Sequence, residues 1–237
     1  MGIPVAGCPC SVCRSDHPFN CRSRPAALIE SDEGKVFVVD MGPDFRFQAL
    51  KHKIQHIDGV LITHTHYDHI AGLDEIRSYH FRQGKSIPIL LSRESYLDCK
   101  IRYYYLPESC INYVILDEAV GAINFEGLPL TYLSYRQAMM QVLGFRIGKF
   151  AYITDIEEHS DEVIRSLQGV ETLVVSALRW TKSPVHLTID EAIAFSKKIG
   201  AKKTYFTHIA HELDHDSTNR ELPENIQLAY DGLELTI

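Results

Sequence analysis

The stretch Thr63-His64-Thr65-His66-Tyr67-Asp68-His69 has the residue types and the spacing of a metal site. Three imidazoles and one carboxylate fall within six residues, and this ligand set suits Zn, Mn or Fe. Paired histidine ligands on a helix lie at i and i+4, whereas the spacing here is too tight for one helical face. We therefore expect a loop that wraps around metal, placed at the end of the apolar strand formed by residues 59–63.

A second group of potential ligands lies near the start of the chain. Three of the six cysteines, Cys8, Cys10 and Cys13, fall within six residues, which is poor geometry for independent disulfides. In an intracellular chain this spacing is more typical of metal binding than of disulfides. Three thiolates need a fourth ligand to close a tetrahedral zinc site, and Cys21 is the nearest candidate in the sequence. Cys99 and Cys110 lack ligand spacing and are expected to be small buried residues.

Composition limits the class of protein. At 237 residues and 45% hydrophobic, the chain can form one large domain, which we predict to span residues 1–237. The net charge of −7 argues against non-specific nucleic-acid binding, which needs a basic face. No stretch approaches the ~20 apolar residues of a membrane span, and the cysteine group stands where a signal peptide would have its apolar region. We predict a cytoplasmic protein.

The elements that must position these residues alternate between strand and helix, which predicts an α/β layered domain. Two hairpins are expected, one over residues 26–30 and 36–40 and one over residues 142–147 and 150–154, with a further hairpin over residues 226–237. A strand over residues 204–207 precedes His208. Helices are expected over residues 43–52, 93–106, 160–167 and 187–199. In the last of these, Thr188 and Glu191 form a capping box.

The motif at residues 63–69 resembles that of the metallo-β-lactamase superfamily, and further matches extend the resemblance along the chain. Asp155 ends a strand at residues 150–155, and His208 ends the strand at residues 204–208. Features similar to the phosphoribosyl 1,2-cyclic phosphate phosphodiesterase branch occur at residues 2–4, 8–13, 207–211 and 230–234. The resemblance implies an αββα sandwich. Relatives carry about a dozen further residues before Gly2-Ile3-Pro4. Either Met1 is a wrongly chosen start, or the chain is truncated and the fold lacks its first edge strand.

By this resemblance, two divalent ions, Zn or Mn, occupy the active site. His64 and His66 would bind the first ion, Asp68, His69 and His208 the second, and Asp155 would bridge them. Two such ions hold the attacking and leaving oxygens of a phosphoryl displacement and lower the pKa of bound water to ~7. The predicted catalytic residues are Asp68 and His186, of which His186 would be the general acid toward the leaving oxygen.

Two further assignments also depend on the resemblance. Relatives carry a histidine ligand where this chain has Gln137, whose carbonyl is a weak ligand compared with imidazole. The first metal site is therefore expected to be weak, to take Mn rather than Zn, or to be empty. His211 is the favoured fourth ligand of a structural zinc with Cys8, Cys10 and Cys13, and Cys21 is its rival.

These residues predict a metal-dependent phosphodiesterase in which a metal-bound hydroxide cleaves a small cyclic or diester phosphate. One alternative is a tRNA 3′-processing nuclease of the same superfamily, although that activity calls for a basic arm that the sequence lacks. The other is a catalytically impaired metal-binding protein, which Gln137 favours. The expected partner is the small phosphodiester substrate, and a homodimer is compatible with the sequence.

Overall fold

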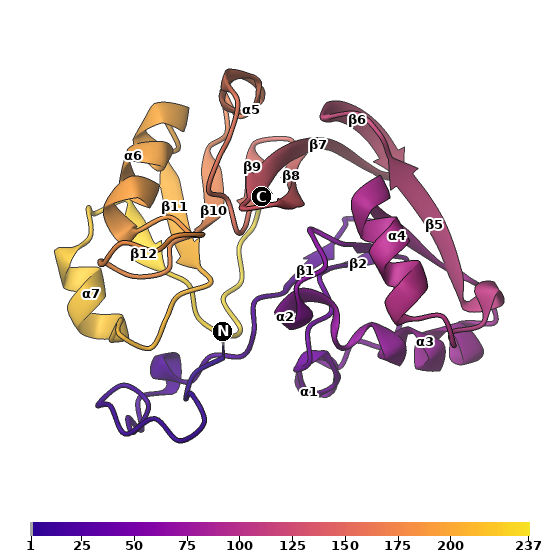
Figure 1. Cartoon of the computed structure of the whole chain (residues 1–237), viewed down its shortest axis with the longest axis horizontal. Helices are drawn as coiled ribbons and strands as arrows, with labels where there is room; N and C mark the ends of the chain where they lie inside the picture. The colour runs from indigo at the N-terminus through magenta and orange to yellow at the C-terminus, as the bar shows by residue number, and fades with distance from the viewer. Residues whose placement is uncertain (1) are drawn as a thin grey trace. The chain divides into compact units, whose positions relative to one another are not determined.

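The computed structural model describes residues 2–237, which divide into two compact units. Of the described residues, unit 1 comprises 2–23, Ala119–Gly121 and Leu130–Ile237, and unit 2 comprises Arg24–Glu118 and Ala122–Pro129. Figure 1 shows the elements of each unit. None of the helices in the described residues combines the length and the apolar character that a membrane crossing requires.

Unit 2 contains a five-stranded sheet in the order β1-β2-β3-β4-β5. Strands β1 and β2 are antiparallel, and the β2–β3, β3–β4 and β4–β5 pairs are parallel. Every residue of β3 and β4 is buried, as expected for parallel strands covered on both faces. The bounds are β1 (Ala27–Glu30), β2 (Val36–Val39), β3 (Gly59–Leu61), β4 (Ile87–Ser92) and β5 (Ile111–Leu116).

The helices of unit 2 bury one face of this sheet. Helices α3 and α4 lie along β4 and β5 (Figure 1), and the core between them includes Phe45, Ile76 and Leu91. The helical segments are α1 (Phe45–Lys51), α2 (Tyr67–Ile70), η2 (Leu73–Glu75), α3 (Ile76–Gln83), α4 (Arg93–Arg102) and η3 (Glu108–Cys110).

The second sheet has seven strands in the order β12-β11-β10-β9-β8-β7-β6. Strands β9 to β12 pair in parallel, whereas β7–β8 and β8–β9 are antiparallel. The carboxyl ends of β9, β10 and β11 therefore meet at one edge. The bounds are β6 (Val120–Phe125), β7 (Leu128–Gln137), β8 (Met140–Ile147), β9 (Phe150–Ile153), β10 (Thr172–Ser176), β11 (Lys203–Thr207) and β12 (Ile226–Leu228).

Unit 1 also holds η1 (Pro18–Asn20), α5 (Asp161–Ser166), α6 (Ile189–Ile199) and α7 (His215–Glu221). Helix α6 begins with the predicted capping box of Thr188 and Glu191 and ends at Gly200, which has a left-handed backbone, as Gly at this position allows. The core of unit 1 includes Ile153, Val175 and Phe206 from the sheet and Phe195 from α6.

Several predicted elements differ in extent from those observed. The hairpins at β1–β2 and β8–β9 are confirmed. The final hairpin is wrong: β12 pairs in parallel with β11, and residues 229–237 add no strand. The helix over residues 93–106 ends at Arg102, and the following tyrosines lie in a turn. A short helix, α2, begins within the histidine motif at Tyr67, so that Asp68 and His69 lie in its first turn.

Candidate metal centres

The histidine motif (His64–His69) lies in unit 2, where β3 leads into α2. His64 and His69 are fully buried, His66 is exposed and Asp68 is half-buried. The side chains face one another: His64 Nε2 lies 2.9 Å from His66 Nδ1, and the rings of His64 and His69 have centroids 4.2 Å apart. The loop at a strand end that the sequence predicted is present, and within unit 2 it brings the three imidazoles together.

Asp40, which the sequence analysis did not single out, orients this motif. It follows β2, the parallel neighbour of β3, and is fully buried. Its Oδ2 lies 2.7 Å from His69 Nδ1 and accepts a hydrogen bond of 2.7 Å from Thr63 Oγ1, and its Oδ1 accepts from the Thr63 N–H at 2.8 Å. A carboxylate that holds one ring nitrogen of a histidine orients the ring for metal binding through the other. The signal in the sequence was the apolar run Val36-Phe37-Val38-Val39 ending in Asp.

A close backbone contact holds α2 in place. A Cβ built on Gly42 would lie 2.1 Å from the carbonyl oxygen of Asp68, and one on Gly72 would lie 2.2 Å from the carbonyl oxygen of Gly42. These distances are far below contact, so both positions need glycine. The backbone of the segment after β2 thereby lies directly against the backbone of the histidine motif.

The Asp155 cluster (Asp155, His186 and His208) forms at the carboxyl ends of the parallel strands of unit 1. Asp155 follows β9 and His208 follows β11, and His186 lies in the loop between β10 and α6. Asp155 Oδ1 lies 3.2 Å from His186 Nδ1 and 3.4 Å from His208 Nε2, and the two rings stack with centroids 4.9 Å apart. Asp155 and His208 are buried, and their ligand atoms and that of His186 lie within 4.8 Å of one another.

Both strand-end residues have a left-handed backbone, with φ of 53° at Asp155 and 53° at His208, and Asp40 has φ of 62°. Asp and His tolerate this region better than most residues. Non-glycine residues in this conformation cluster at functional sites and cost of order 1–3 kcal/mol each. The left-handed backbone turns the chain at the end of the strand. The side chains of Asp155 and His208 thereby lie close together at the edge of the sheet.

Gln137, at the end of β7, lies against the Asp155 cluster and is buried. Its Nε2 donates to Asp155 Oδ1 at 3.0 Å and to the carbonyl oxygen of Val185 at 3.1 Å, and it lies 3.1 Å from His186 Nδ1. Its Oε1 has no hydrogen-bond partner among the described residues. Gln137 therefore stands beside the predicted ligands, where its amide nitrogen faces the carboxylate.

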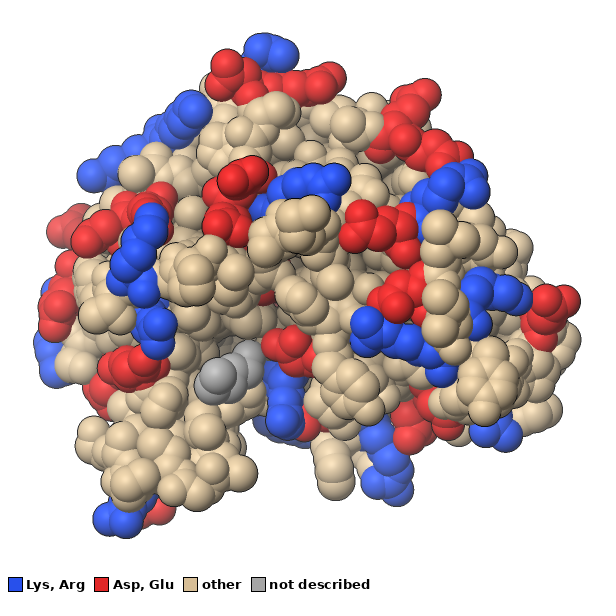
Figure 2. Space-filling view, in the orientation of Figure 1, with Lys and Arg blue, Asp and Glu red and all other residues tan. Residues whose placement is uncertain are grey.

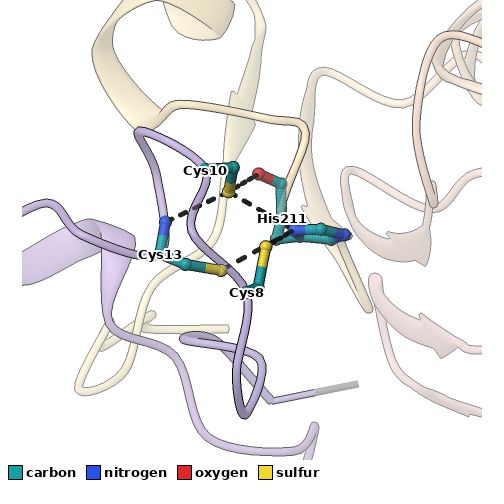
Figure 3. Close-up of side chains that lie close together, drawn as sticks. All are labelled: Cys8, Cys10, Cys13 and His211. Carbon is teal, nitrogen blue, oxygen red and sulfur yellow. Dashed lines mark hydrogen bonds between the residues drawn. The ribbon is translucent and has the colours of Figure 1, made fainter.

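The cysteine cluster (Cys8, Cys10, Cys13 and His211) brings the start of unit 1 to the loop after β11 (Figure 3). His211 Nδ1 lies 3.3 Å from Cys8 Sγ, 3.4 Å from Cys10 Sγ and 3.6 Å from Cys13 Sγ. Ligands bound to tetrahedral zinc at ~2.0–2.3 Å are separated by ~3.3–3.8 Å. The spacing of the four atoms therefore fits zinc. Among the described residues, Cys21 is exposed and does not belong to this group of ligand atoms.

Backbone donors also favour thiolate in the cysteine cluster. The N–H of Cys13 donates to Cys10 Sγ at 3.4 Å, and the N–H of Val5 donates to Cys13 Sγ at 3.3 Å. The Cys13 N–H, with His211 beside it, lowers the pKa of Cys10 to about 6. Burial raises the pKa of Cys13. The backbone donor and His211 therefore favour the thiolate of Cys10, and the thiolate is the form that binds metal.

Comparisons with known proteins agree with the fold. Residues 35–209 match the family described as "Beta-lactamase superfamily domain". A solved structure described as "a New Diphosphatase from the PhnP Family" has 37% sequence identity and a TM-score of 0.93, and the match covers 99% of this chain and 92% of that one.

Two curated relatives have other names. An octanoyltransferase of Porphyromonas gingivalis is 34% identical over 245 residues, which cover 100% of this chain and 49% of that protein. The chain thus spans about half the length of that relative. A ribonuclease Z of Staphylococcus saprophyticus subsp. saprophyticus is 31% identical over 97 residues, which cover 38% of this chain and 31% of that protein.

Two mixed sheets flanked by helices, with imidazoles and carboxylates gathered at strand ends, are the features of an α/β domain with potential metal ligands at the edges of its sheets. The chain belongs to the metallo-β-lactamase superfamily, and within it resembles the PhnP family.

Proposed function

We propose that the chain is a phosphodiesterase that hydrolyses a small cyclic or diester phosphate with divalent metal. The observation that carries this proposal is the likeness to a PhnP-family diphosphatase along 99% of the chain. A diphosphatase breaks a P–O bond, so the likeness supports phosphoryl chemistry over other superfamily reactions. The imidazoles and carboxylates of the histidine motif and the Asp155 cluster are groups that can bind the divalent ions used in such chemistry.

The ligands we propose are those that the resemblance indicates, and their chemistry fits divalent ions. They are His64, His66, Asp68 and His69 from unit 2 and Asp155 and His208 from unit 1. When bound, two divalent ions neutralise the charge of the phosphate and activate water for attack. The chain fixes its own ligands in advance: Asp40 holds His69, and Thr154 Oγ1 donates to Asp155 Oδ2 at 2.7 Å.

The cysteine cluster is proposed to hold one structural zinc, because four ligand atoms already stand at zinc-ligand spacing. Thiols remain available as ligands in a reducing compartment, which supports the predicted cytoplasmic location. The homodimer also remains a proposal, and light scattering of the purified chain decides it.

The nuclease alternative has less support than the phosphodiesterase. The similarity to ribonuclease Z covers 38% of the chain, and Lys and Arg are interspersed with Asp and Glu over the face in Figure 2. A single-sign basic field, the usual footprint for RNA, does not occupy that face. The octanoyltransferase relative has as much sequence outside the match as within it, so its acyl chemistry can reside in the other half.

Turnover of bis(p-nitrophenyl) phosphate, of a diphosphate ester and of a tRNA precursor, each with Mn²⁺ or Zn²⁺, tests the proposal. We expect the diester to be cleaved and Asp155→Ala to abolish cleavage and reduce bound metal, because this carboxylate is shared by both imidazoles of its cluster. Asp161→Ala, which removes an exposed carboxylate at the start of α5, is the control. Cleavage of the tRNA precursor alone, or full activity in Asp155→Ala, would overturn the proposal.

A further inference from the structure

The resemblance implies an imidazole at position 137, and the structure shows what the glutamine there contacts instead. Gln137 Nε2 donates to the carbonyl oxygen of Val185 at 3.1 Å and to Asp155 Oδ1 at 3.0 Å. The first bond holds the β10–α6 loop at the residue just before His186. The second fixes the carboxylate toward which His186 points. An imidazole at position 137 has no NH₂ group that could make both bonds.

The distances around Asp155 differ from those of a strong histidine–carboxylate hydrogen bond. Such bonds are usually ~2.7–2.9 Å long, as the His69–Asp40 pair is in this chain at 2.7 Å. His186 Nδ1 and His208 Nε2 lie 3.2 Å and 3.4 Å from the same oxygen, Asp155 Oδ1. Ligands of one tetrahedral ion with bonds of ~2.0–2.1 Å are ~3.3 Å apart. The two imidazoles therefore stand at the separation of ligands that share an ion with Asp155.

We propose that His186 is a metal ligand, together with Asp155 and His208, and that it supplies the imidazole that position 137 lacks. Gln137 is then a positioning residue: it holds the loop and the carboxylate so that His186 reaches the ion. Ligating carboxylates and histidines commonly depend on such neighbours. This inference depends on the proposed function in one respect: both require that the site holds a metal ion.

The assignment changes the role of His186. A ring nitrogen that binds metal cannot also deliver a proton from the same atom, so with Nδ1 as the metal ligand only Nε2 could carry out the general-acid role that the resemblance gives His186. His186 is only partly buried, with 14% of its side chain exposed. Its loop can therefore accept substitutions without opening the core of unit 1.

Mn²⁺ is a suitable probe, because it binds sites that offer carboxylate oxygens, whereas the thiolates of the cysteine cluster select zinc. Mn²⁺ affinity would be measured by calorimetry on the full chain. His186→Ala should weaken Mn²⁺ affinity ~10–100-fold or more, because the loss of a residue that only supports a metal ligand already costs this much. Gln137→Leu, which keeps the bulk and removes the amide, should weaken it by a smaller factor. His52→Ala removes an exposed imidazole as the control.

The decisive variant is His186→Ala combined with Gln137→His. Gln137 already points at Asp155, so an imidazole there should restore Mn²⁺ affinity to within about tenfold of the parent. If His186→Ala binds Mn²⁺ as tightly as the parent, His186 is not a metal ligand. If the double variant binds Mn²⁺ as weakly as His186→Ala, an imidazole at position 137 cannot replace that of His186. Circular dichroism shows whether each variant is folded. If no variant cleaves any phosphodiester while the affinities follow this pattern, the proposed function fails and the ligand assignment stands.

Discussion

At the scale of single residues, the centres depend on buried groups that orient the ligands. Asp40 accepts hydrogen bonds from Thr63 and faces His69 with no exposure to solvent. A buried carboxylate costs free energy unless it is fully paired, and here its partners lie in or beside the histidine motif. We infer that the buried Asp40 orients the ring of His69 by holding Nδ1, so that Nε2 points away from Asp40.

We expect Asp40→Asn to weaken binding of Zn²⁺ or Mn²⁺ by ~10–100-fold, the usual cost of removing a group that orients a ligand. The amide keeps only one acceptor and turns NH₂ toward groups that themselves donate. Metal affinity and turnover should fall together. Asp58→Asn is the control, since Asp58 accepts from the Val36 N–H on the same sheet at 3.0 Å but does not contact the motif. Equal affinities in the two variants would contradict this role of Asp40.

At the scale of elements, helix α7 and the segment before β1 are held together by one capping residue. Asp214 Oδ1 accepts from the Ser217 N–H at 3.0 Å, and Oδ2 accepts from Asn20 Nδ2 at 2.7 Å. The Ser217 bond, with the help of Asn20, lowers the pKa of Asp214 to about 2 from the ordinary 3.8. The carboxylate thus caps the helix and fixes η1 against it.

Asp214→Ala should lower the free energy of unfolding by about 1 kcal/mol, the usual cost of losing an N-cap. Because folding depresses the pKa, the contribution is fully present above pH 3.8 and is lost as the pH falls toward about 2, so the difference from the parent should shrink over that window. Denaturant unfolding at several pH values measures it. Asp216→Ala should cost less, since Asp216 makes only a 3.5 Å contact with His17. A difference independent of pH would show that the carboxylate is not responsible.

At the scale of the whole molecule, the cysteine cluster connects residues that are about two hundred positions apart in the chain, such as Cys8 and His211. The same segment stacks Phe19 on Tyr230, with ring centroids 4.0 Å apart. Before β1 the described residues form only the short η1 helix and one isolated bridge, between Ile3 and Arg22. It therefore depends on these contacts, and a zinc ion at the cluster would contribute directly to folding.

Cys10→Ser and His211→Ala should each lose about one zinc per chain and lower the melting temperature, by ~2–4 °C for each kcal/mol lost in a chain of this size. Elemental analysis and calorimetry measure the two effects. Cys21→Ser, at an exposed cysteine outside the cluster, should keep both zinc and melting temperature. A loss of zinc in Cys21→Ser with retention in His211→Ala would return the fourth ligand to Cys21.

The sequence by itself determined the superfamily and the types of ligand. The spacing of His64, His66, Asp68 and His69 is local, and a strand that ends in Asp155 is visible as an apolar run, so both could be predicted without a structure. The capping box at Thr188 was predictable for the same reason, because its partners are three residues apart. Elements were misjudged where the pattern was weak: β5, β6 and α7 were not foreseen, and the last hairpin was wrong.

Only the tertiary structure decided which distant residues meet. Asp40 became recognisable once β2 paired with β3 and placed its carboxylate beside His69. His211, not Cys21, stands with the three thiols because the loop after β11 returns to the start of the chain. The contacts of Gln137 with Asp155 and Val185 depend on strands β7 and β9 and the loop after β10 ending at the same edge. These neighbours lie 18 to 203 positions apart in the chain, a range over which local spacing carries no signal.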